Sequence, residues 1–206
     1  MRRRVYNGSK PDKNTLLLLH GNSFIDEGRY EHVISARDVT ISTDGPFNEY
    51  YYFAGTSTSK MSVGNIKISS TQQFTLETFI KQTSRNTTAS IFSNGVGSLQ
   101  FRLVSGKLNI LKEYVVEWKT DTQVLSLNTW FHVALIFTGT KILVFLDGIK
   151  RIDFSVSNFS ESSGLAIGYN KSDPNNSEMF HGGMSEIRVS DIARWTSNFT
   201  PPTKPY

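Results

Sequence analysis

The few carboxylates of this chain that could break a bond are spaced in a way that argues against catalysis. Glu113 and Glu117 lie four positions apart in a segment typical of a strand, so their side chains share one face. A retaining glycosidase uses two carboxylates about 5 to 5.5 Å apart that act on one sugar. The position between them is Val115, and Glu77 and Glu186 stand alone in their segments. We therefore expect solvent-facing strand carboxylates and no enzymatic activity.

The histidines do not form a metal-binding pattern. His20, His32, His132 and His181 show no spacing such as H-x-x-x-H, and the chain has no cysteine for a thiolate site or a disulfide. The patterns G-x-S-x-G, G-x-G-x-x-G and the P-loop are also absent. These observations favour a protein that binds a partner over one that transforms a substrate.

Aromatic residues beside polar ones are the residues best suited to hold a sugar. An aromatic ring offers a flat apolar face, and a neighbouring amide or carboxylate offers hydrogen bonds. Trp118 lies between Glu117 and Lys119, and Tyr169 is followed by Asn170. We predict Trp118, Tyr169 and Asn170 as ligand-binding residues.

Composition and charge limit the classes of partner that the chain could bind. The chain has 206 residues, of which 38% are hydrophobic and 12% aromatic, a mixture that suits a pleated sheet. The net charge is +4, but three positive residues sit together at Arg2–Arg4, and elsewhere Lys and Arg are mixed with Asp and Glu, so no basic stripe crosses the body. We expect no nucleic-acid partner.

The apolar runs are too short for a membrane segment. Leu16–Leu19 has four residues, and Val133–Phe137 and Ile142–Leu146 have five each, whereas a transmembrane helix needs about 20 and a secretory signal needs about 7 to 15. We expect no transmembrane segment, no signal peptide and no membrane insertion.

Short segments of two-residue alternation must position these side chains. In "QFTLETFIKQ", Phe74, Leu76 and Ile80 share one face, whereas Glu77 and Phe79 share the other. About twelve such segments recur at spacings of about 8 to 12 residues, with no helix of ordinary length. The sequence predicts an all-β fold, a two-sheet antiparallel β-sandwich of the jelly-roll kind. Residues 1–14 form a basic arm, and residues 15–206 form one domain.

Turn residues punctuate this pattern. Asn94-Gly95, Ser105-Gly106 and Asp147-Gly148 each predict a hairpin, because Gly, Asn and Asp tolerate positive φ. The meander over 130–154 is hydrophobic on both faces, so we expect a further layer on each. Asp191 begins a segment, "DIARW", that could form one helical turn.

The order of several segments resembles the concanavalin A-like, laminin-G-type jelly rolls. "NTLLLLHGNSFIDEG" resembles the first strand of that family, "FTLETFIK" a central strand, and "NTWFHVALIFTGTKILVFLDGIKR" its strongest stretch. "HGGMSEIRVSDIARWTSNFTPPTKPY" resembles the closing segment, and the matches cover roughly residues 15 to 206. The resemblance implies a β-sandwich used for binding and display, in which Trp130 and Trp195 pack the sandwich.

The closing segment is the most specific of these matches. With Arg194-Trp195, Phe199 and Pro201-Pro202, it is similar to laminin-G-like domains found in bacteriophage tail, fibre and capsid-decoration proteins. Position 184 is Met and position 185 is Ser, where many relatives have a hydrophobic residue and Asp.

The resemblance also implies one Ca²⁺, held by oxygen atoms of the first loop and the last strand. Oxygen-only ligation is what such a hard cation needs. By position, Asp26 and Glu186 are the metal candidates. The alternative is that both side chains are exposed or form salt bridges.

Together these observations predict a non-enzymatic virion module of the tail-fibre or capsid-decoration type. It would bind host-surface glycan or neighbouring virion proteins, form a homo-oligomer, and assemble in the host cytoplasm. One alternative is a cellular carbohydrate-binding lectin domain, and another is a glycoside hydrolase of the same fold.

Overall fold

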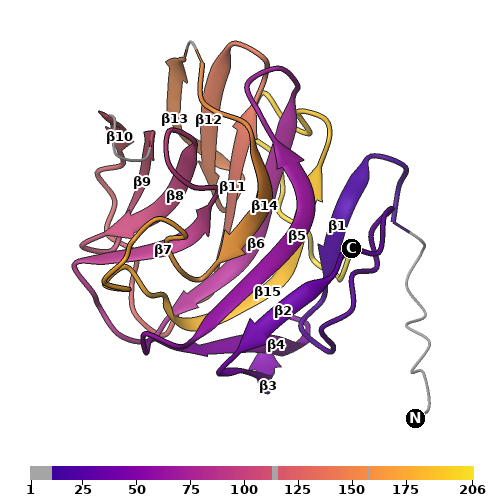
Figure 1. Cartoon of the computed structure of the whole chain (residues 1–206), viewed down its shortest axis with the longest axis vertical. Coiled ribbons are helices and arrows are strands. Elements are labelled where there is room, and N and C mark those ends of the chain that lie inside the picture. Colours follow the sequence, from indigo (N-terminus) through magenta and orange to yellow (C-terminus); the bar gives the residue numbers. More distant parts are fainter. Residues whose placement is uncertain (1–10, 113–115, 157) are drawn as a thin grey trace.

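The computed structural model describes residues 11–112, 116–156 and 158–206, and only the backbone of residues 116–118 and 162. These residues form fifteen strands, which build two stacked antiparallel sheets (Figure 1). The strands are β1 (Thr15–Leu19), β2 (Ile34–Arg37), β3 (Val39–Gly45), β4 (Asn48–Ala54), β5 (Lys60–Ile68), β6 (Phe74–Gln82), β7 (Thr88–Ser93), β8 (Leu99–Val104), β9 (Lys107–Lys112), β10 (Val116–Thr120), β11 (Phe131–Phe137), β12 (Lys141–Leu146), β13 (Ile149–Ser155), β14 (Ser162–Ile167) and β15 (His181–Ser190). The predicted all-β sandwich is confirmed.

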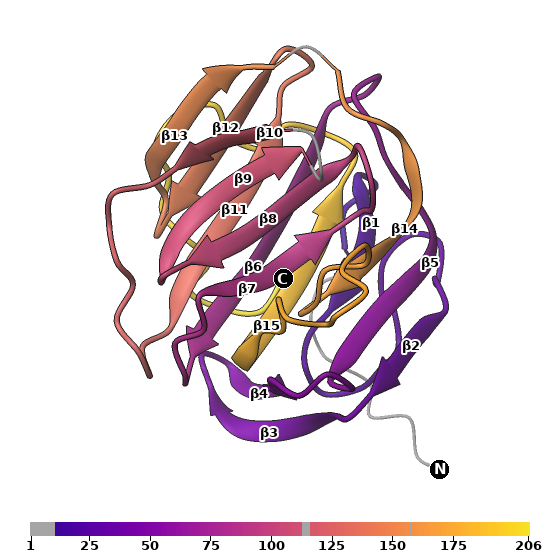
Figure 2. The ribbon, with the colours of Figure 1, turned by 60° about the vertical axis from the view of Figure 1, so that its left-hand side comes forward.

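One sheet has eight strands and the other has seven. The eight-stranded sheet has the order β13-β12-β11-β6-β15-β4-β3, and β1 pairs with β15 beside that path. The seven-stranded sheet has the order β10-β9-β8-β7-β14-β5-β2. Figure 2 shows β7, β8 and β9 in front of β6, β11 and β15, which belong to the other layer. The main hydrophobic core lies between the two sheets.

Two hairpins close as the turn residues predict. Ser105 and Gly106 between β8 and β9 have φ of 48° and 77°, and Asp147 and Gly148 between β12 and β13 have 48° and 76°. Two consecutive positive φ angles are the geometry of a type I′ turn, whose twist matches that of the strands it joins. The loop that contains Asn94 is longer, and the Asn94 N–H donates to Leu99 O at 3.1 Å.

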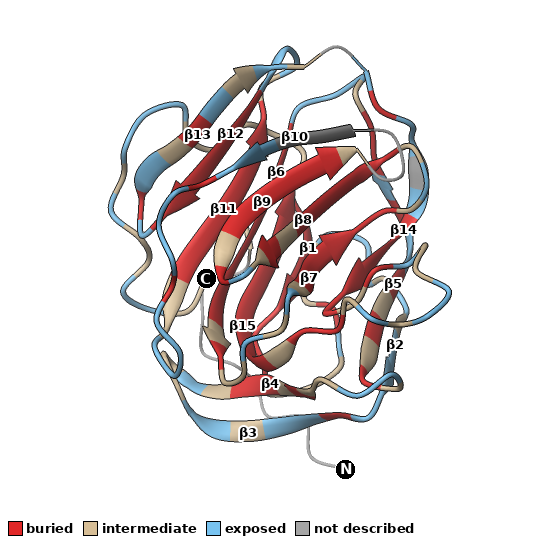
Figure 3. Ribbon diagram, turned by 90° about the vertical axis from the view of Figure 1, so that its left-hand side faces the viewer, coloured by how far each residue is buried: buried red, intermediate tan, exposed pale blue. Residues whose placement is uncertain are grey.

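Both faces of the meander are covered, as its composition predicts. Val133, Leu135 and Phe137 of β11 point into the core between the sheets. Ala134 and Ile136 point to the opposite face, where the tail after β15 packs against them. Figure 3 shows β11 and β12 buried along most of their length, unlike β13 and β3 near the rims.

The tail does not contain the expected helical turn. Residues 191–195 form no helix, and neither does any other part of the chain that the structure describes. The Thr75 hydroxyl of β6 donates to Ile192 O at 2.8 Å and accepts from Arg194 N at 3.1 Å. The bond from Thr75 takes the Ile192 carbonyl, which a helix would pair internally, so the segment is tied to β6 instead. No described segment is a helix of the length and apolarity that crossing a membrane requires.

Candidate functional site

The outer face of the seven-stranded sheet carries a layer of polar side chains. Phe101 and Leu103 of β8 point into the core, so Gln100 and Arg102 point outward. Arg102 pairs in register with Asn109 of β9. Gln100 and Asn109 are fully buried although they lie on the outer face, which means that other groups cover them.

Glu178, from the segment between β14 and β15, closes this layer. Its Oε1 accepts from Arg102 Nη1 at 3.0 Å, and its Oε2 accepts from Gln100 Nε2 and from Asn170 Nδ2, the latter at 3.0 Å. Arg102 Nε donates to Asn109 Oδ1 at 2.8 Å. The Arg102 and Glu178 side chains are 15% and 19% exposed, so this charged pair meets solvent while buried amides hold it from below. We call these five residues the polar layer.

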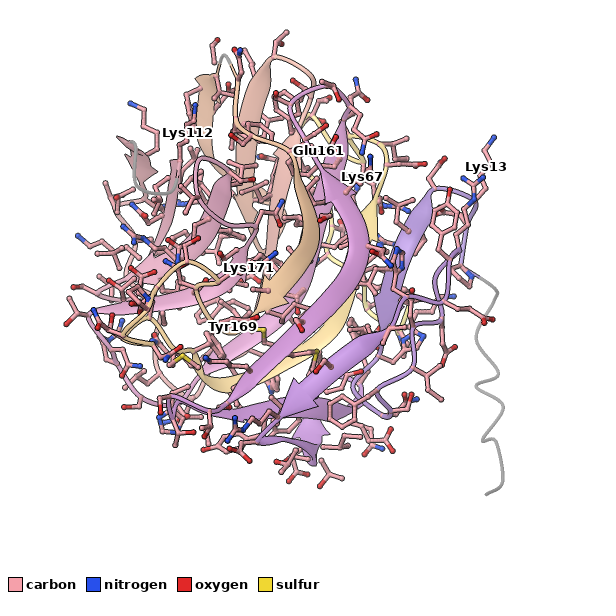
Figure 4. All side chains as sticks on the ribbon, in the orientation of Figure 1. Lys13, Lys67, Lys112, Glu161, Tyr169 and Lys171 are labelled. Carbon is pink, nitrogen blue, oxygen red and sulfur yellow. The ribbon has the colours of Figure 1, made fainter. Side chains whose placement is uncertain are left out.

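Tyr169 flanks the polar layer at the end of β14. Lys60 Nζ lies 5.3 Å from the centre of its ring. Burial raises the pKa of the Tyr169 hydroxyl, and a hydrogen bond with Ser62 opposes this. Figure 4 shows Tyr169 and Lys171 where β14 leads into the segment that contains Glu178. The ring is half-buried, so part of it is available to a ligand.

The predicted ligand residues fall on this same sheet with different environments. Asn170 is 6% exposed, and its amide is engaged on both sides, with Ser172 N donating to Oδ1 at 2.8 Å. It therefore positions the loop beneath Tyr169. Trp118 lies on β10, at the far edge of the sheet, and its side chain lies outside the described residues. A ligand role for these residues stays a prediction.

The carboxylates expected to face solvent divide into two groups. Glu113 and the side chain of Glu117 lie outside the described residues. The expectation is wrong for Glu77 and Glu186, which are 0% and 1% exposed. Each is covered by residues distant in the sequence, which alternation within one strand does not reveal.

Glu77 lies in a buried cluster beneath the tail, on the outer face of the eight-stranded sheet. Its Oε1 accepts from Arg188 Nε at 2.7 Å, and its Oε2 accepts from the Tyr206 hydroxyl and lies 3.2 Å from His132 Nε2. Burial opposes ionisation of Glu77, but the His132 hydrogen bond and the Arg188 charge outweigh it, so the pKa is below its usual value. The cluster is sealed from substrate and anchors the tail.

The tryptophans implied to pack the fold are held by aromatic contacts on the same outer face. Trp195 stacks on Phe199 with ring centres 3.8 Å apart. Trp130 lies edge-on to Tyr50 at 5.2 Å, and Lys81 Nζ lies 5.0 Å from the Trp130 ring. Trp195 packs with the outer hydrophobic cluster over β11 and β12, and both tryptophans are half-buried.

Asp26 organises the first loop. Its Oδ1 accepts from the backbone N–H of Leu18 at 2.9 Å and of Gly28 at 2.7 Å. Its Oδ2 accepts from the backbone N–H and from Nδ1 of His32, both at 2.8 Å. Each oxygen thus already has two donors, which is the acceptor capacity of a carboxylate.

Glu186 lies at a β-bulge of β15, with a φ of 53°. His20 Nδ1 lies 2.9 Å from both of its carboxylate oxygens, and Tyr206 N donates to Oε2 at 3.1 Å. Among the described residues, no group of three or more His, Asp or Glu side chains could hold a metal ion. Because Asp26 and Glu186 already accept hydrogen bonds from N–H donors, these residues do not fit Ca²⁺ as they are arranged here.

Of the five residues of the polar layer, only Asn170 was predicted from the sequence as a ligand-binding residue. The alternation in "LQFRLV" places Gln100 and Arg102 on one face and could have signalled an outward polar pair. Glu178 gives no such signal, because it lies in an irregular segment 76 residues from Arg102.

Comparison with known families and structures assigns the fold to a family. A family model for the concanavalin A-like lectin/glucanases superfamily matches residues 53–197. The chain belongs to this superfamily. No curated protein matches it in sequence.

Solved structures share the architecture of this superfamily member at low sequence identity. The binding domain of Paraclostridial Mosquitocidal Protein 1 has a TM-score of 0.72 and 14% identity, over 88% of this chain and 49% of that one. The Botulinum neurotoxin serotype G binding domain has a TM-score of 0.66 and 12% identity, over 87% and 48%. The chain therefore spans about half the length of these two structures.

Domain 4 of AbnA, a GH43 extracellular arabinanase from Geobacillus stearothermophilus, was solved in complex with arabinotriose. It has a TM-score of 0.66 and 16% identity, over 87% of this chain and 93% of that one. These similarities show a common fold.

Proposed function

We propose that this chain is a carbohydrate-binding module that uses the outer face of the seven-stranded sheet and does not cleave its ligand. The observation that carries the proposal is the Arg102–Glu178 pair, held at the surface by Gln100, Asn109 and Asn170. Sugar hydroxyls both donate and accept hydrogen bonds, so a fixed cation beside a fixed anion complements them. Because buried partners already order these side chains, little conformational freedom is lost on binding.

The arabinotriose complex of AbnA domain 4 supports this proposal more strongly than the toxin structures do. The similarity covers 93% of the AbnA chain, so nearly all of that sugar-binding chain has a counterpart here. For the two toxin binding domains it covers only about half, which leaves the other half free to carry their ligands. We infer that the shared sandwich is itself a sugar-binding scaffold.

A binding role without catalysis fits the engagement of Glu178. Both of its oxygens accept hydrogen bonds from Arg102, Gln100 and Asn170, an arrangement that holds the carboxylate in one orientation. Hydrolysis remains the alternative. If the chain cleaved β-glucans and lost this activity in Glu113→Gln or Glu117→Gln, it would be a glycoside hydrolase and the proposal would be wrong.

The test is a glycan array followed by calorimetric titration of the strongest hit. An aromatic contact contributes about 0.5–1.5 kcal/mol, so Tyr169→Ala should weaken binding about two- to tenfold. Tyr52→Ala is the matched control, because Tyr52 is also half-buried but lies on the eight-stranded sheet. An unchanged affinity in Tyr169→Ala, or an equal loss in Tyr52→Ala, would remove the outer face as the site.

A narrower form of the proposal places the module on a virus particle, where it would bind host glycan or a neighbouring virion protein as a homo-oligomer. Its support is the resemblance of the closing segment, Arg194-Trp195 to Pro201-Pro202, to phage tail and capsid-decoration domains. Deleting residues 1–13 should then abolish incorporation into particles. In a cellular lectin the same deletion would leave glycan binding untouched, with no particle to enter.

A further inference from the structure

A pocket opens where the first loop meets β5, and it shares no residue with the polar layer or Tyr169. Its volume is about 490 Å³, within the range of about 300–1,000 Å³ that is usual for ligand sites. β2 begins at Ile34, so the stretch of β5 after Val63 extends beyond its paired neighbour. The lining residues are Leu16, Tyr30–Val33, Gly64–Lys67, Gln72 and Asp191.

Tyr30 is the exposed aromatic of this pocket. It is 58% exposed, which is unusual for a large aromatic side chain in this fold. The guanidinium of Arg29 lies 5.1 Å from the ring centre, and the ring of His32 meets it edge-on at 5.8 Å. These contacts hold the ring in one orientation, so a ligand would not have to order it.

His32 lines the pocket with 7% of its side chain exposed, and its ring has a fixed orientation. Asp26 accepts from both the backbone N–H and Nδ1 of His32 at 2.8 Å. A proton therefore resides on Nδ1, and in the neutral ring Nε2 is left as an acceptor. This is the arrangement by which a carboxylate fixes the tautomer of a ligand-binding histidine.

Asp191 supplies a second acceptor. Its Oδ1 is buried and has no hydrogen-bond partner among the described residues. A buried carboxylate oxygen without a donor is unfavourable. Asp191 lines the pocket, so a ligand hydroxyl would satisfy this oxygen once the carboxylate turns toward it. The backbone N–H of Asp191 is already bonded to Asn14 O at 3.0 Å, which holds the residue in place.

The charges around the pocket define its ligand. Glu31 and Asp191 disfavour an anion, whereas Lys67 lies on the same wall with its Nζ 3.1 Å from Glu161 (Figure 4). Acceptors and a donor beside one aromatic face match a neutral polyhydroxylated ring. We propose that this pocket is a second saccharide-binding site, which takes one sugar residue against Tyr30. The choice of a saccharide as the ligand rests on the proposed function, whereas the location of the site rests on the pocket alone.

Gly64 at the pocket provides a way to block it without disturbing the fold. A Cβ built there meets only Val33 O, at 3.9 Å, and its φ lies outside the left-handed region. A larger side chain in an exposed strand position is sterically allowed. Gly64→Leu should therefore fold normally and fill the mouth of the pocket.

The experiment is a ¹H–¹⁵N NMR titration of the full chain with the neutral sugars arabinotriose, cellotriose and lactose. We expect at least one of these sugars to shift the amide signals of Glu31, His32, Asn65 and Lys67 in a saturable way. The affinity read from these signals should fall about two- to tenfold in Tyr30→Ala and at least tenfold in Gly64→Leu, which fills the site. Ile149→Ala, an exposed apolar residue on β13, is the control.

The same titration separates this inference from the proposed site. In Tyr169→Ala the pocket signals should still shift with unchanged affinity, even if binding at the polar layer is lost. The inference is overturned if no sugar of the panel shifts the pocket signals, or if the shifts persist unchanged in Gly64→Leu. Pocket binding without any response at Tyr169 would overturn the proposed outer-face site and leave this inference standing.

Discussion

Replacing Glu77 with Gln removes one charge from the buried cluster while keeping the size of the side chain. Arg188 Nε then loses a carboxylate at 2.7 Å, and the Arg188 side chain is only 11% exposed. Breaking a buried ion pair on one side costs about 3–5 kcal/mol, because the remaining charge is left uncompensated. The Gln amide oxygen still accepts one hydrogen bond, so we expect a loss near the lower end, about 3 kcal/mol.

The same substitution should change the acid dependence of stability. The pKa of Glu77 is below its ordinary value of 4.5 in the folded chain, since the His132 hydrogen bond and the Arg188 charge outweigh burial. A carboxyl group with a lowered folded pKa contributes stability that is fully present above its unfolded pKa and is lost as pH falls through the folded pKa. The stability of the wild-type chain should therefore decline as the pH falls below the ordinary glutamate pKa of 4.5. Glu77→Gln should lack this part of the decline.

Urea unfolding monitored by circular dichroism, from neutral pH down to about pH 3, measures both effects. Glu161→Gln is the control, because Glu161 pairs with Lys67 at 3.1 Å while the two side chains are 48% and 67% exposed. Such a pair contributes under about 1 kcal/mol. If Glu77→Gln cost no more than Glu161→Gln, or if its acid curve ran parallel to the wild-type curve, the cluster would not anchor the tail as described.

Three further outcomes follow from the same contacts. Gly148→Ala should cost at least about 1–3 kcal/mol in urea unfolding, because φ is +76° and the added Cβ would lie 1.9 Å from Phe199 O; a neutral result would contradict the tail's close approach to this turn. Asp26→Asn should cost about 1–3 kcal/mol and alter the ring resonances of His32, since Asn cannot accept all four N–H groups; unchanged resonances would refute the loop-organising role. The melting temperature should be the same in millimolar Ca²⁺ as in a chelator, because Asp26 and Glu186 are already bonded to N–H groups. A melting temperature that rises with calcium concentration would show a calcium site.

Local features of this fold could be predicted from sequence because they depend on neighbouring residues. Asp147-Gly148 forms its turn through the positive φ angles those residues tolerate, and the alternation along β11 correctly predicts a layer on each face. Glu77 was predicted wrongly for the opposite reason. Its partner Arg188 is 111 residues away, and no pattern within one strand reveals what covers its outer face.

The candidate site could be predicted from sequence only in part, because it also depends on residues from distant segments. Tyr169 stands out in the sequence as an aromatic beside an amide, but the burial of Asn170 depends on Ser93 and Glu178, which other segments supply. Glu186 has a positive φ that a glutamate rarely adopts, so its bulge has no sequence signal.

The position of β15 has a consequence for how the chain acquires its structure. β15 lies between β6 and β4 and also pairs with β1, so the eight-stranded sheet is held together by a strand that begins at His181. During synthesis, the strands that pair with β15 keep unpaired edges until residues 181–190 have emerged. Such long-range pairing places folding in the slow regime of roughly milliseconds to seconds. Truncation before His181 should accordingly yield a product that aggregates instead of a smaller sandwich.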